Sequence, residues 1–381
     1  MLRTAPATSG AVPAVAAHRR RRLRAGAATL APRAVAASCK VGSLTLTSWL
    51  LALECDGVVD SGLVTLLTSC ASACKRISNL VARAPVDGLV GLAASSNASG
   101  DEQKKLDVLA HDVFARAVSD SGRVSVLVSE ELEAPGAVSS GGYIACFDPI
   151  DGSSNIDAAI PTGSIFGIYA QGECEIDPDA DAPDALVEKC LLNARQAGTE
   201  LVAAGYCLYS SSTVFVLTVK TGVVGFTLDR TVGEFILSHP CIKIPHPGQR
   251  ILSGNLGNAG KWAPPLKAYL DSIVTHRPST EPVYSYRYVG ALVADFHRTL
   301  LYGGIWLYPP DSSAPSGKAR LLYEVAPMAL LAEQAGGLAT WGPTAEDRVL
   351  EVVPSAVHAR SPLFTGSAVE VRKLQAALKG R

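Results

Sequence analysis

One short stretch, residues 146–157, constrains the fold more than any other part of this sequence. Residues 143–147 alternate in apolar character before a proline and a glycine, which predicts a buried strand that ends in a tight turn. The turn carries two carboxylates, Asp148 and Asp151, so oxygen ligands are expected at the end of a strand. A chain organised around this feature is expected to fold as an α/β protein.

The residues that follow the turn are suited to bind an anion. The backbone amides of Gly152, Ser153 and Ser154 can open a helix, where unpaired N–H groups and the positive end of the dipole favour a phosphate. Cation ligands and an anion site within seven residues indicate metal-assisted phosphoryl chemistry. The simpler alternative is an acidic turn followed by a serine that caps a helix.

Length and composition exclude several classes of protein. The 381 residues are 48% hydrophobic and 18% charged, which predicts a large core and two domains. A formal net charge of −1 argues against nucleic acid as a partner. The apolar run at residues 44–53 is interrupted by Thr and Ser and is too short to span a bilayer, so no membrane partner is expected.

Residues 1–39 differ in composition from the rest of the chain. They are rich in Ala, Ser, Thr and Arg, and the first acidic residue of the sequence is Glu54. This composition is typical of an organellar transit peptide that is removed, although a basic tail that stays attached would look the same. The nine cysteines, without CxxC pairs, argue against a disulfide framework or a zinc site and leave room for one regulatory pair.

Further acids lie beside other predicted elements. Apolar residues between 106 and 117 keep helical spacing, with Asp107 inside this helix and Asp101 in the loop before it. Residues 124–128 predict a buried strand that delivers Glu130 and Glu131 at its end. Such a cluster of carboxylates would repel without cations, and it suits Mg²⁺, with Mn²⁺ as a substitute.

The remaining segments give weaker signals. Residues 171–198 form an irregular acidic stretch that is expected to be a surface insertion. Several prolines mark a domain boundary near residue 243. Lys318 and Arg320 alternate on one face of a predicted strand, and Glu324 is expected to open a helix.

From about residue 44 to residue 378 the sequence resembles the fructose-1,6-bisphosphatase family, and more loosely the lithium-sensitive sugar phosphatases. The motifs that carry this resemblance are SGDEQKKLDVL, VSEE, FDPIDGSSNID, GSIFGIY and KARLLYEVAPMALLAEQAGG. The resemblance implies a layered α-β-α-β-α sandwich with mixed sheets. It also implies an N-terminal domain, residues 40–243, with the metal-binding carboxylates, and a sugar-phosphate-binding C-terminal domain, residues 244–381.

By the same resemblance, each site residue has an expected role. The metal ligands are Glu130, Glu131, Asp148, Asp151, Glu324 and the carbonyl of Ile150. Asp101, Asp107 and Glu130 are the expected catalytic residues. The substrate is expected to contact Gly152, Ser153, Ser154, Asn255, Arg287, Tyr288, Tyr308, Lys318 and Arg320, with Arg287 reaching into a neighbouring subunit of a homotetramer.

The insertion at residues 171–198 resembles the redox loop of plastid members of the family. Cys174 and Cys190 are the expected disulfide pair, and Arg195 stands where a third cysteine would fall. The disulfide is expected to lower activity and thioredoxin to restore it. The resemblance of this loop to that of plastid members predicts that the protein is located in the plastid stroma.

The implied activity is hydrolysis of the 1-phosphate of a sugar bisphosphate, fructose 1,6-bisphosphate, in the Calvin cycle and starch synthesis. Sedoheptulose-1,7-bisphosphatase or a dual bisphosphatase is the nearest alternative. An inositol monophosphatase is disfavoured because that family carries Thr after the glycine of the acidic turn, where this chain has Ser153. A remote alternative is an inactive regulatory paralogue, which a missing metal carboxylate would favour.

Overall fold

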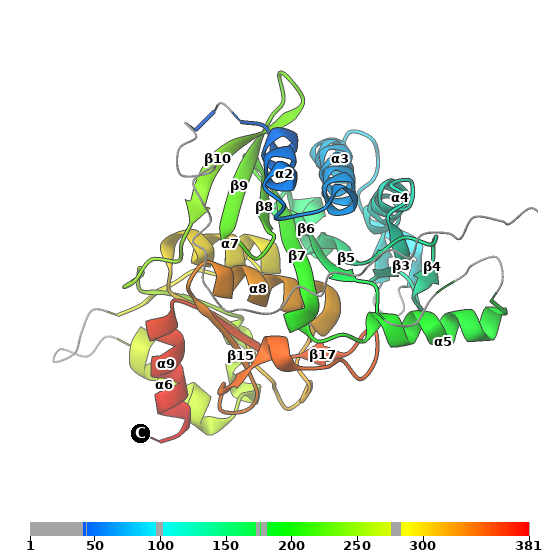
Figure 1. The fold of residues 1–381 in the computed structure, drawn as a ribbon. Helices are drawn as coiled ribbons and strands as arrows, with labels where there is room; N and C mark the ends of the chain where they lie inside the picture. The colour runs from blue at the N-terminus through cyan, green and yellow to red at the C-terminus, as the bar shows by residue number, and fades with distance from the viewer. Residues whose placement is uncertain are drawn as a thin grey trace, which may run out of the picture. The chain divides into compact units, whose positions relative to one another are not determined.

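The computed structural model describes residues 41–42, 44–96, 102–172, 176, 181–275 and 283–380. An eight-stranded sheet lies in the first part of the chain (Figure 1). Its order is β10 (Glu234–Ile242), β9 (Val223–Asp229), β8 (Thr213–Thr218), β7 (Leu201–Tyr209), β6 (Thr162–Ala170), β5 (Tyr143–Asp151), β3 (Val124–Ser129) and β4 (Gly136–Ala137). Only β3 and β5 pair in parallel within this sheet. The strands expected at residues 124–128 and 143–147 are confirmed.

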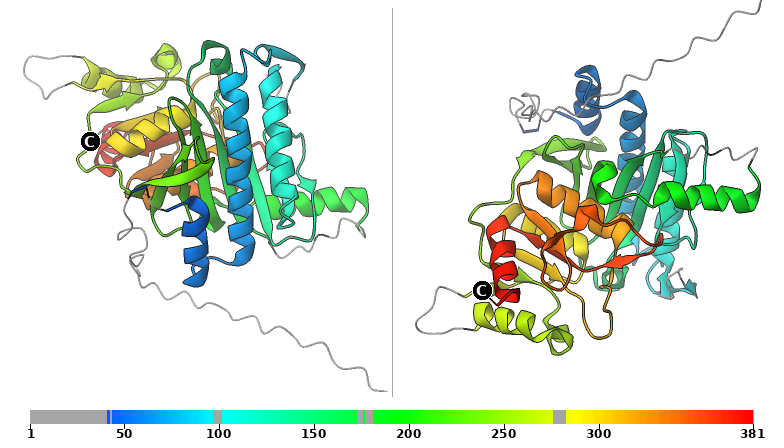
Figure 2. Two further views of the ribbon diagram at one scale, coloured as in Figure 1. Left: turned by 90° about the horizontal axis from the view of Figure 1, so that it is seen from above. Right: turned by 60° about the horizontal axis from the view of Figure 1, so that its bottom comes forward.

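Three helices cover one face of the eight-stranded sheet. They are α2 (Leu46–Cys55), α3 (Ser61–Arg83) and α4 (Lys105–Ser119), and Figure 2 shows α3 and α4 side by side. Their apolar faces share one core with the aromatic residues of the strands. Phe114 of α4, for example, stacks on Phe147 of β5 with ring centroids 4.5 Å apart. The helical spacing of apolar residues is what produces this contact.

The opposite face of the sheet packs on α7 (Leu292–Tyr302) and α8 (Ala326–Gln334), which also contact a second sheet. That sheet has the order β12 (Ser285–Tyr286), β11 (Ile251–Ser253), β13 (Ile305–Tyr308), β18 (Leu363–Gly366), β15 (Leu338–Trp341) and β16 (Asp347–Arg348). Helices α6 (Pro264–Val274) and α9 (Ala368–Leu378) cover its outer face. The expected mixed α/β fold with alternating layers is therefore confirmed.

Short elements connect these layers. The strand pairs are β1 (Leu92–Ser96) with β2 (Glu102–Lys104), and β14 (Ala319–Arg320) with β17 (Arg360–Ser361). The short helical turns are η1 (Ser153–Ala158), η2 (Gly198–Glu200), η3 (Leu256–Lys261), η4 (Leu321–Val325) and η5 (Val349–Glu351).

Two expectations differ from the structure. The stretch 171–198 is not irregular throughout, because Pro183–Ala194 forms helix α5, which packs against β3 and β4. Proline at its first position favours a helix start, a signal that the surrounding acids obscured. Glu324 does not open α8 but lies in the π-helical turn η4 just before it. None of the described helices is long and apolar enough to cross a membrane.

The domain boundary near residue 243 stays a prediction. The last strand of the first sheet, β10, ends at Ile242, and the first strand of the second sheet, β11, begins at Ile251. The elements on either side pack together through α7 and α8, and the described residues form one compact unit.

Candidate active site

A pocket of about 440 Å³ opens between the two sheets. Its wall is formed by the ends of β3 and β5, the start of η1, the first turn of α7, and residues from β13, β14, η4 and β17. Segments from both halves of the chain therefore meet at one concave site.

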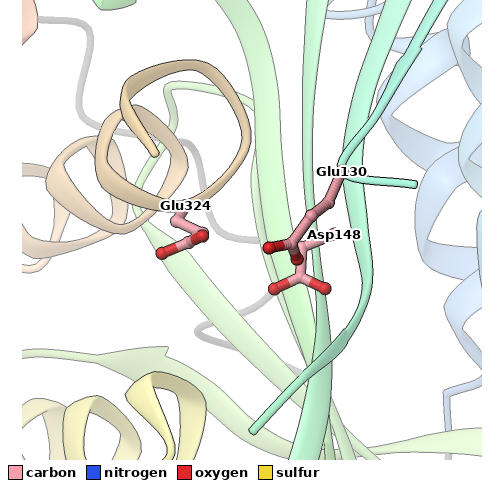
Figure 3. Close-up of side chains that lie close together, drawn as sticks. All are labelled: Glu130, Asp148 and Glu324. Carbon is pink, nitrogen blue, oxygen red and sulfur yellow. The ribbon is translucent and has the colours of Figure 1, made fainter. Parts of the chain in front are cut away.

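Three carboxylates lie close together in this pocket. Glu130 follows β3, Asp148 lies in β5 and Glu324 lies in η4, and a ligand oxygen from each lies within 4.8 Å of the others. Figure 3 shows the three side chains pointing toward one another from two neighbouring strands and a helical turn. Asp151 and Glu131, two more of the expected metal ligands, line the same pocket.

Strand pairing explains why these acids meet. Because β3 and β5 are parallel, their carboxyl ends lie at the same edge of the sheet, and the Glu130 amide donates to the Phe147 carbonyl at 3.3 Å. Asp148 pairs with Ile165 and Asp151 with Gly163, so β5 has one extra residue between its two acids. This bulge breaks the alternation of side chains and lets both carboxylates face the pocket.

The bulge is held from the neighbouring strands. The Ser164 hydroxyl of β6 donates to the Pro149 carbonyl at 2.6 Å. It also bonds the Tyr209 hydroxyl of β7 at 2.7 Å. The backbone between the two acids is thus fixed by buried side chains that do not themselves line the pocket.

Burial shapes the protonation of the carboxyls. It raises the pKa of Glu130 and that of Asp107, each to about 7, and the pKa of Asp151 to about 6. The pKa values of Asp148 and Glu324 are also raised, first by burial and then by the neighbouring Glu130. These groups are therefore costly to ionise together without a positive charge nearby.

The donor set fits a hard divalent cation. Carboxylate oxygens are the ligands that Mg²⁺ and Mn²⁺ prefer in proteins. Asp148 is 2% exposed, and its Oδ1 has no hydrogen-bond partner within the part of the chain that the structure describes. A buried oxygen of this kind needs either a proton or a cation. The Ile150 residue also lines the pocket beside these acids.

Gly152, Ser153 and Ser154 lie next to the acids at the start of η1. Gly152 has a φ of 75°, and a Cβ placed there would lie 2.6 Å from the Cβ of Ala291. Only glycine suits this close approach in the left-handed region. The segment expected to bind an anion therefore forms a short 3₁₀ turn against the start of α7, and its role stays a prediction.

Another part of the pocket lining, called its basic end below, is basic and phenolic. Tyr288, Tyr308, Lys318 and Arg320 all line it. The Arg320 guanidinium lies 3.8 Å from a carboxylate oxygen of Glu130, so the two ends are in contact. Burial raises the pKa of both tyrosines to about 12, which keeps their hydroxyls available as donors at neutral pH.

The structure does not bring every expected residue into the pocket. Asn255 caps η3 through its bond to the Gly257 amide, and the Arg287 guanidinium donates to the Tyr286 carbonyl; neither lines the pocket. Asp107 does line it. Asp101 and Cys174 lie outside the described residues, while Cys190 is buried on α5.

Sequence reasoning missed six residues that line the pocket, namely Gly290, Ala291, Leu292, Asp295, Trp306 and Arg360. Arg360 pairs with Arg320 across β14 and β17, which adds a third cation to the basic end. Arg320 and Arg360 are 40 positions apart in the sequence, so no local sequence pattern predicts that they pair. Asp295 lies in the first turn of α7, where an acid is ordinarily explained by the helix dipole and does not mark a site.

Comparison with known proteins gives a consistent result. The family model "Fructose-1-6-bisphosphatase, N-terminal domain" matches residues 45–240, and the corresponding C-terminal domain model matches residues 244–379. The chain is 50% identical to the chloroplastic fructose-1,6-bisphosphatase of Triticum aestivum, over 91% of this chain and 84% of the wheat protein. It is 49% identical to the Spinacia oleracea protein of the same description, over 87% and 80% of the two chains.

A solved structure is similar across nearly the whole fold. The holo form of Leishmania major fructose-1,6-bisphosphatase matches with a TM-score of 0.81 and 41% identity. The match covers 89% of this chain and 99% of the Leishmania chain.

Proposed function

Because this chain belongs to the fructose-1,6-bisphosphatase family, we propose that it hydrolyses the 1-phosphate of fructose 1,6-bisphosphate to give fructose 6-phosphate and phosphate. One observation carries the proposal. The carboxylates of Glu130, Asp148 and Glu324 face the same pocket as Lys318 and Arg320. An acidic end for cations beside a basic end for an anion suits a substrate with two phosphates.

Mg²⁺ is the proposed cofactor, with Mn²⁺ as a substitute. The proposed ligands are Glu130, Glu131, Asp148, Asp151, Glu324 and the Ile150 carbonyl, all of which line the pocket. When bound, the cation supplies positive charge that polarises the phosphate and makes water a better nucleophile. The remaining chemistry falls to the side chains and amides of the chain.

The 1-phosphate is proposed to bind the amides of Gly152, Ser153 and Ser154. Asp107, whose pKa burial raises to about 7, can accept the proton of the attacking water near neutral pH. The water oxygen bonds to phosphorus in line with the bond to the sugar oxygen, which breaks as that oxygen leaves and takes up a proton. Asp101 is proposed to assist Asp107.

The distal phosphate is proposed to bind at the basic end. Tyr288 and Tyr308 can each donate a hydroxyl, and Lys318 and Arg320 supply charge-assisted hydrogen bonds. Asn255 is proposed to contact the sugar. The Arg287 guanidinium donates to the Tyr286 carbonyl and does not line the pocket of its own subunit, and Arg287 is proposed to act in the site of a neighbour within a homotetramer.

The setting of this activity is proposed to be the plastid stroma, in the Calvin cycle and starch synthesis. Wheat, spinach and rice relatives at 48 to 50% identity are each described as chloroplastic. Residues 1–39 would then be a transit peptide that is removed. Thioredoxin is the proposed partner for a disulfide between Cys174 and Cys190.

The test is phosphate release by the chain without residues 1–39, with Mg²⁺ and a dithiol reductant. Fructose 1,6-bisphosphate should be hydrolysed at about 1 to 100 turnovers per second, within the usual range for enzymes. Sedoheptulose 1,7-bisphosphate should be hydrolysed much more slowly. Comparable turnover of both substrates would instead make the protein a dual bisphosphatase.

Glu370→Gln serves as a matched control for the acidic residues of the pocket. Glu370 is 5% exposed on α9, accepts hydrogen bonds from Lys373 at 3.1 Å and from the Tyr284 hydroxyl, and does not line the pocket. Folded, reduced protein that releases phosphate from neither bisphosphate would refute the enzymatic proposal and favour a regulatory paralogue.

A further inference from the structure

The loop between β12 and α7 forms one wall of the pocket. It carries Arg287 and Tyr288 and reaches the helix at Ala291. Tyr288, Gly290 and Ala291 all line the pocket. The position of this loop therefore determines where the tyrosine hydroxyl stands relative to the substrate.

One buried carboxylate, that of Asp295, anchors the loop. Its Oδ1 and Oδ2 each accept a bond from the Val289 amide at 3.0 Å, and Oδ2 accepts the Gly290 amide at 2.9 Å. The Ser253 hydroxyl of β11 donates to Oδ1 at 2.9 Å. Asp295 is completely buried, so these bonds are protected from water.

Arg298 completes the anchor from the next turn of α7. One of its guanidinium nitrogens lies 2.5 Å from Oδ1 of Asp295, and the same nitrogen donates to the Arg287 carbonyl at 2.8 Å. Arg298 therefore binds the loop through the Arg287 carbonyl, and Asp295 binds it through the Val289 and Gly290 amides. The side chain of Arg298 is only 19% exposed, which strengthens the pair relative to one at the surface.

A helix cap would be the ordinary explanation for an acid in the first turn of α7. Here a different residue performs that task, because the Leu292 and Val293 amides donate to Asp151 at 3.1 and 2.7 Å. Asp295 instead reaches back to residues that precede the helix. The first turn of α7 therefore contacts the acidic end of the pocket through Asp151 and the loop through Asp295.

We infer that Asp295 is a positioning residue that fixes the loop 287–290 so that Tyr288 stands ready to bind the distal phosphate. This inference rests on the proposed function, because it assigns the distal phosphate to that end of the pocket. It concerns binding of the distal group and leaves the acidic end of the pocket, where the bond breaks, unaffected.

The test is Asp295→Asn in the full-length protein, assayed with fructose 1,6-bisphosphate and with fructose 1-phosphate. Asparagine has the same shape, but one acceptor oxygen becomes an NH₂ group that faces the amide donors. KM for the bisphosphate should rise about tenfold while kcat stays within about threefold, the pattern of lost ground-state binding. The preference for bisphosphate over monophosphate, as a ratio of kcat/KM, should fall by about fivefold or more.

The two-substrate ratio separates positioning from general damage. A purely structural role would lower kcat/KM for both substrates alike, and an unchanged ratio in the folded variant would overturn the inference. Glu370→Gln removes the charge of another buried helical acid with a lysine partner three residues on. Glutamine can still accept the Tyr284 hydroxyl just before β12, so this variant should leave the ratio unchanged. If the wild-type enzyme hydrolyses neither substrate, that result refutes the proposed function and not the positioning role of Asp295 alone.

A second variant covers the case in which Asp295→Asn does not fold. Arg298→Met removes the bond to the Arg287 carbonyl and the ion pair, but leaves the Asp295 carboxylate bonded to Val289 and Gly290. The substrate preference should fall in the same direction, by about threefold. A folded Arg298→Met enzyme with the preference of wild type would overturn the inference.

Discussion

Glu324 illustrates how a single side chain is set by its surroundings. Burial and the neighbouring Glu130 and Asp151 raise the pKa of its carboxyl, so its charge is unfavourable until a cation is bound. The same arrangement that makes a good cation site thus makes the metal-free protein less stable.

Glu324→Gln should therefore change activity and stability in opposite directions. Without divalent cations, removal of one of the clustered charges should raise the unfolding free energy by about 1 kcal/mol. With Mg²⁺, the rise in melting temperature should be smaller than the rise expected for wild type, and turnover should fall by about 100-fold or more. The measurement is thermal unfolding with chelator and with Mg²⁺, alongside phosphate release.

Glu370→Gln changes an acid that does not line the pocket, and it is the control for loss of a buried acid. A Glu324→Gln enzyme with the full Mg²⁺-dependent increase in melting temperature would exclude Glu324 as a ligand.

At the scale of residues, the sequence predicted most of the pocket lining but not all of it. Asp148, Asp151 and Gly152 share one short motif, so their proximity follows from local geometry. Arg360 and Asp295 could not be found in this way, because their position depends on which distant strand or loop lies beside them. Local sequence patterns predict where a strand or helix ends. Which elements then lie beside each other depends on the tertiary fold.

At the scale of elements, α7 packs between the eight-stranded sheet and the second sheet and contacts both. His297 on α7 accepts or donates a hydrogen bond with the Tyr206 hydroxyl of β7 at 2.7 Å. Burial and, to a smaller extent, the nearby His239 lower the pKa of His297 to about 4. The pKa of His239 is itself lowered by burial.

This histidine predicts a loss of stability in mild acid. The pKa is about 4 in the folded state and about 6.5 when unfolded, so the unfolded chain binds the proton more tightly. Stability is complete above pH 6.5 and is lost as the pH falls from 6.5 toward 4, by about 2 kcal/mol for a partly buried group. His297→Gln keeps an acceptor for Tyr206 but does not titrate.

The variant and wild type should therefore differ in their pH dependence. Denaturant unfolding at pH 7 and pH 5, with Mg²⁺ present throughout, should show wild type losing more stability than His297→Gln. The acidic pocket titrates equally in both proteins, so it cancels in the comparison. Equal losses of unfolding free energy in the two proteins would show that protonation of His297 does not destabilise the packing of α7.

Strands and helices with clear periodicity were predictable, and segments with competing signals were not. The alternation at residues 143–147 and the helical spacing between 106 and 117 both correspond to elements of the structure. Helix α5 was missed because charged residues surround its apolar positions and suggest a loop. Tertiary packing against β3 and β4 gives this helix support that its own sequence does not reveal.

At the scale of the whole molecule, α5 lies where it could transmit a redox signal to the pocket. Figure 1 shows α5 in bright green below β3 and β4, at one edge of the eight-stranded sheet. It packs against β3, the strand that delivers Glu130, and the Asn193 side chain accepts the Gly172 amide at 2.9 Å just after β6. Arg195, where a third cysteine is expected from the resemblance, donates to the Pro354 carbonyl at 3.0 Å.

Oxidation of the Cys174 and Cys190 thiols would form one S–S bond and release two electrons and two protons to an oxidant. A thioredoxin dithiol would reverse the step and become a disulfide itself. Cys190 is 1% exposed and shares a core with residues of β3 and β5, so a bond that pulls on it would shift α5 against β3. The predicted consequence is displacement of Glu130 and lower activity.

Phosphate release before and after reduction should therefore differ severalfold in wild type. Cys190→Ser cannot form the bond, so it should show the activity of the reduced enzyme under both conditions. Cys241→Ser, which removes an exposed cysteine on β10, is the matched control and should respond to reduction as wild type does. A Cys190→Ser enzyme with the wild-type response would place the redox switch elsewhere, because no disulfide through α5 could then be its cause.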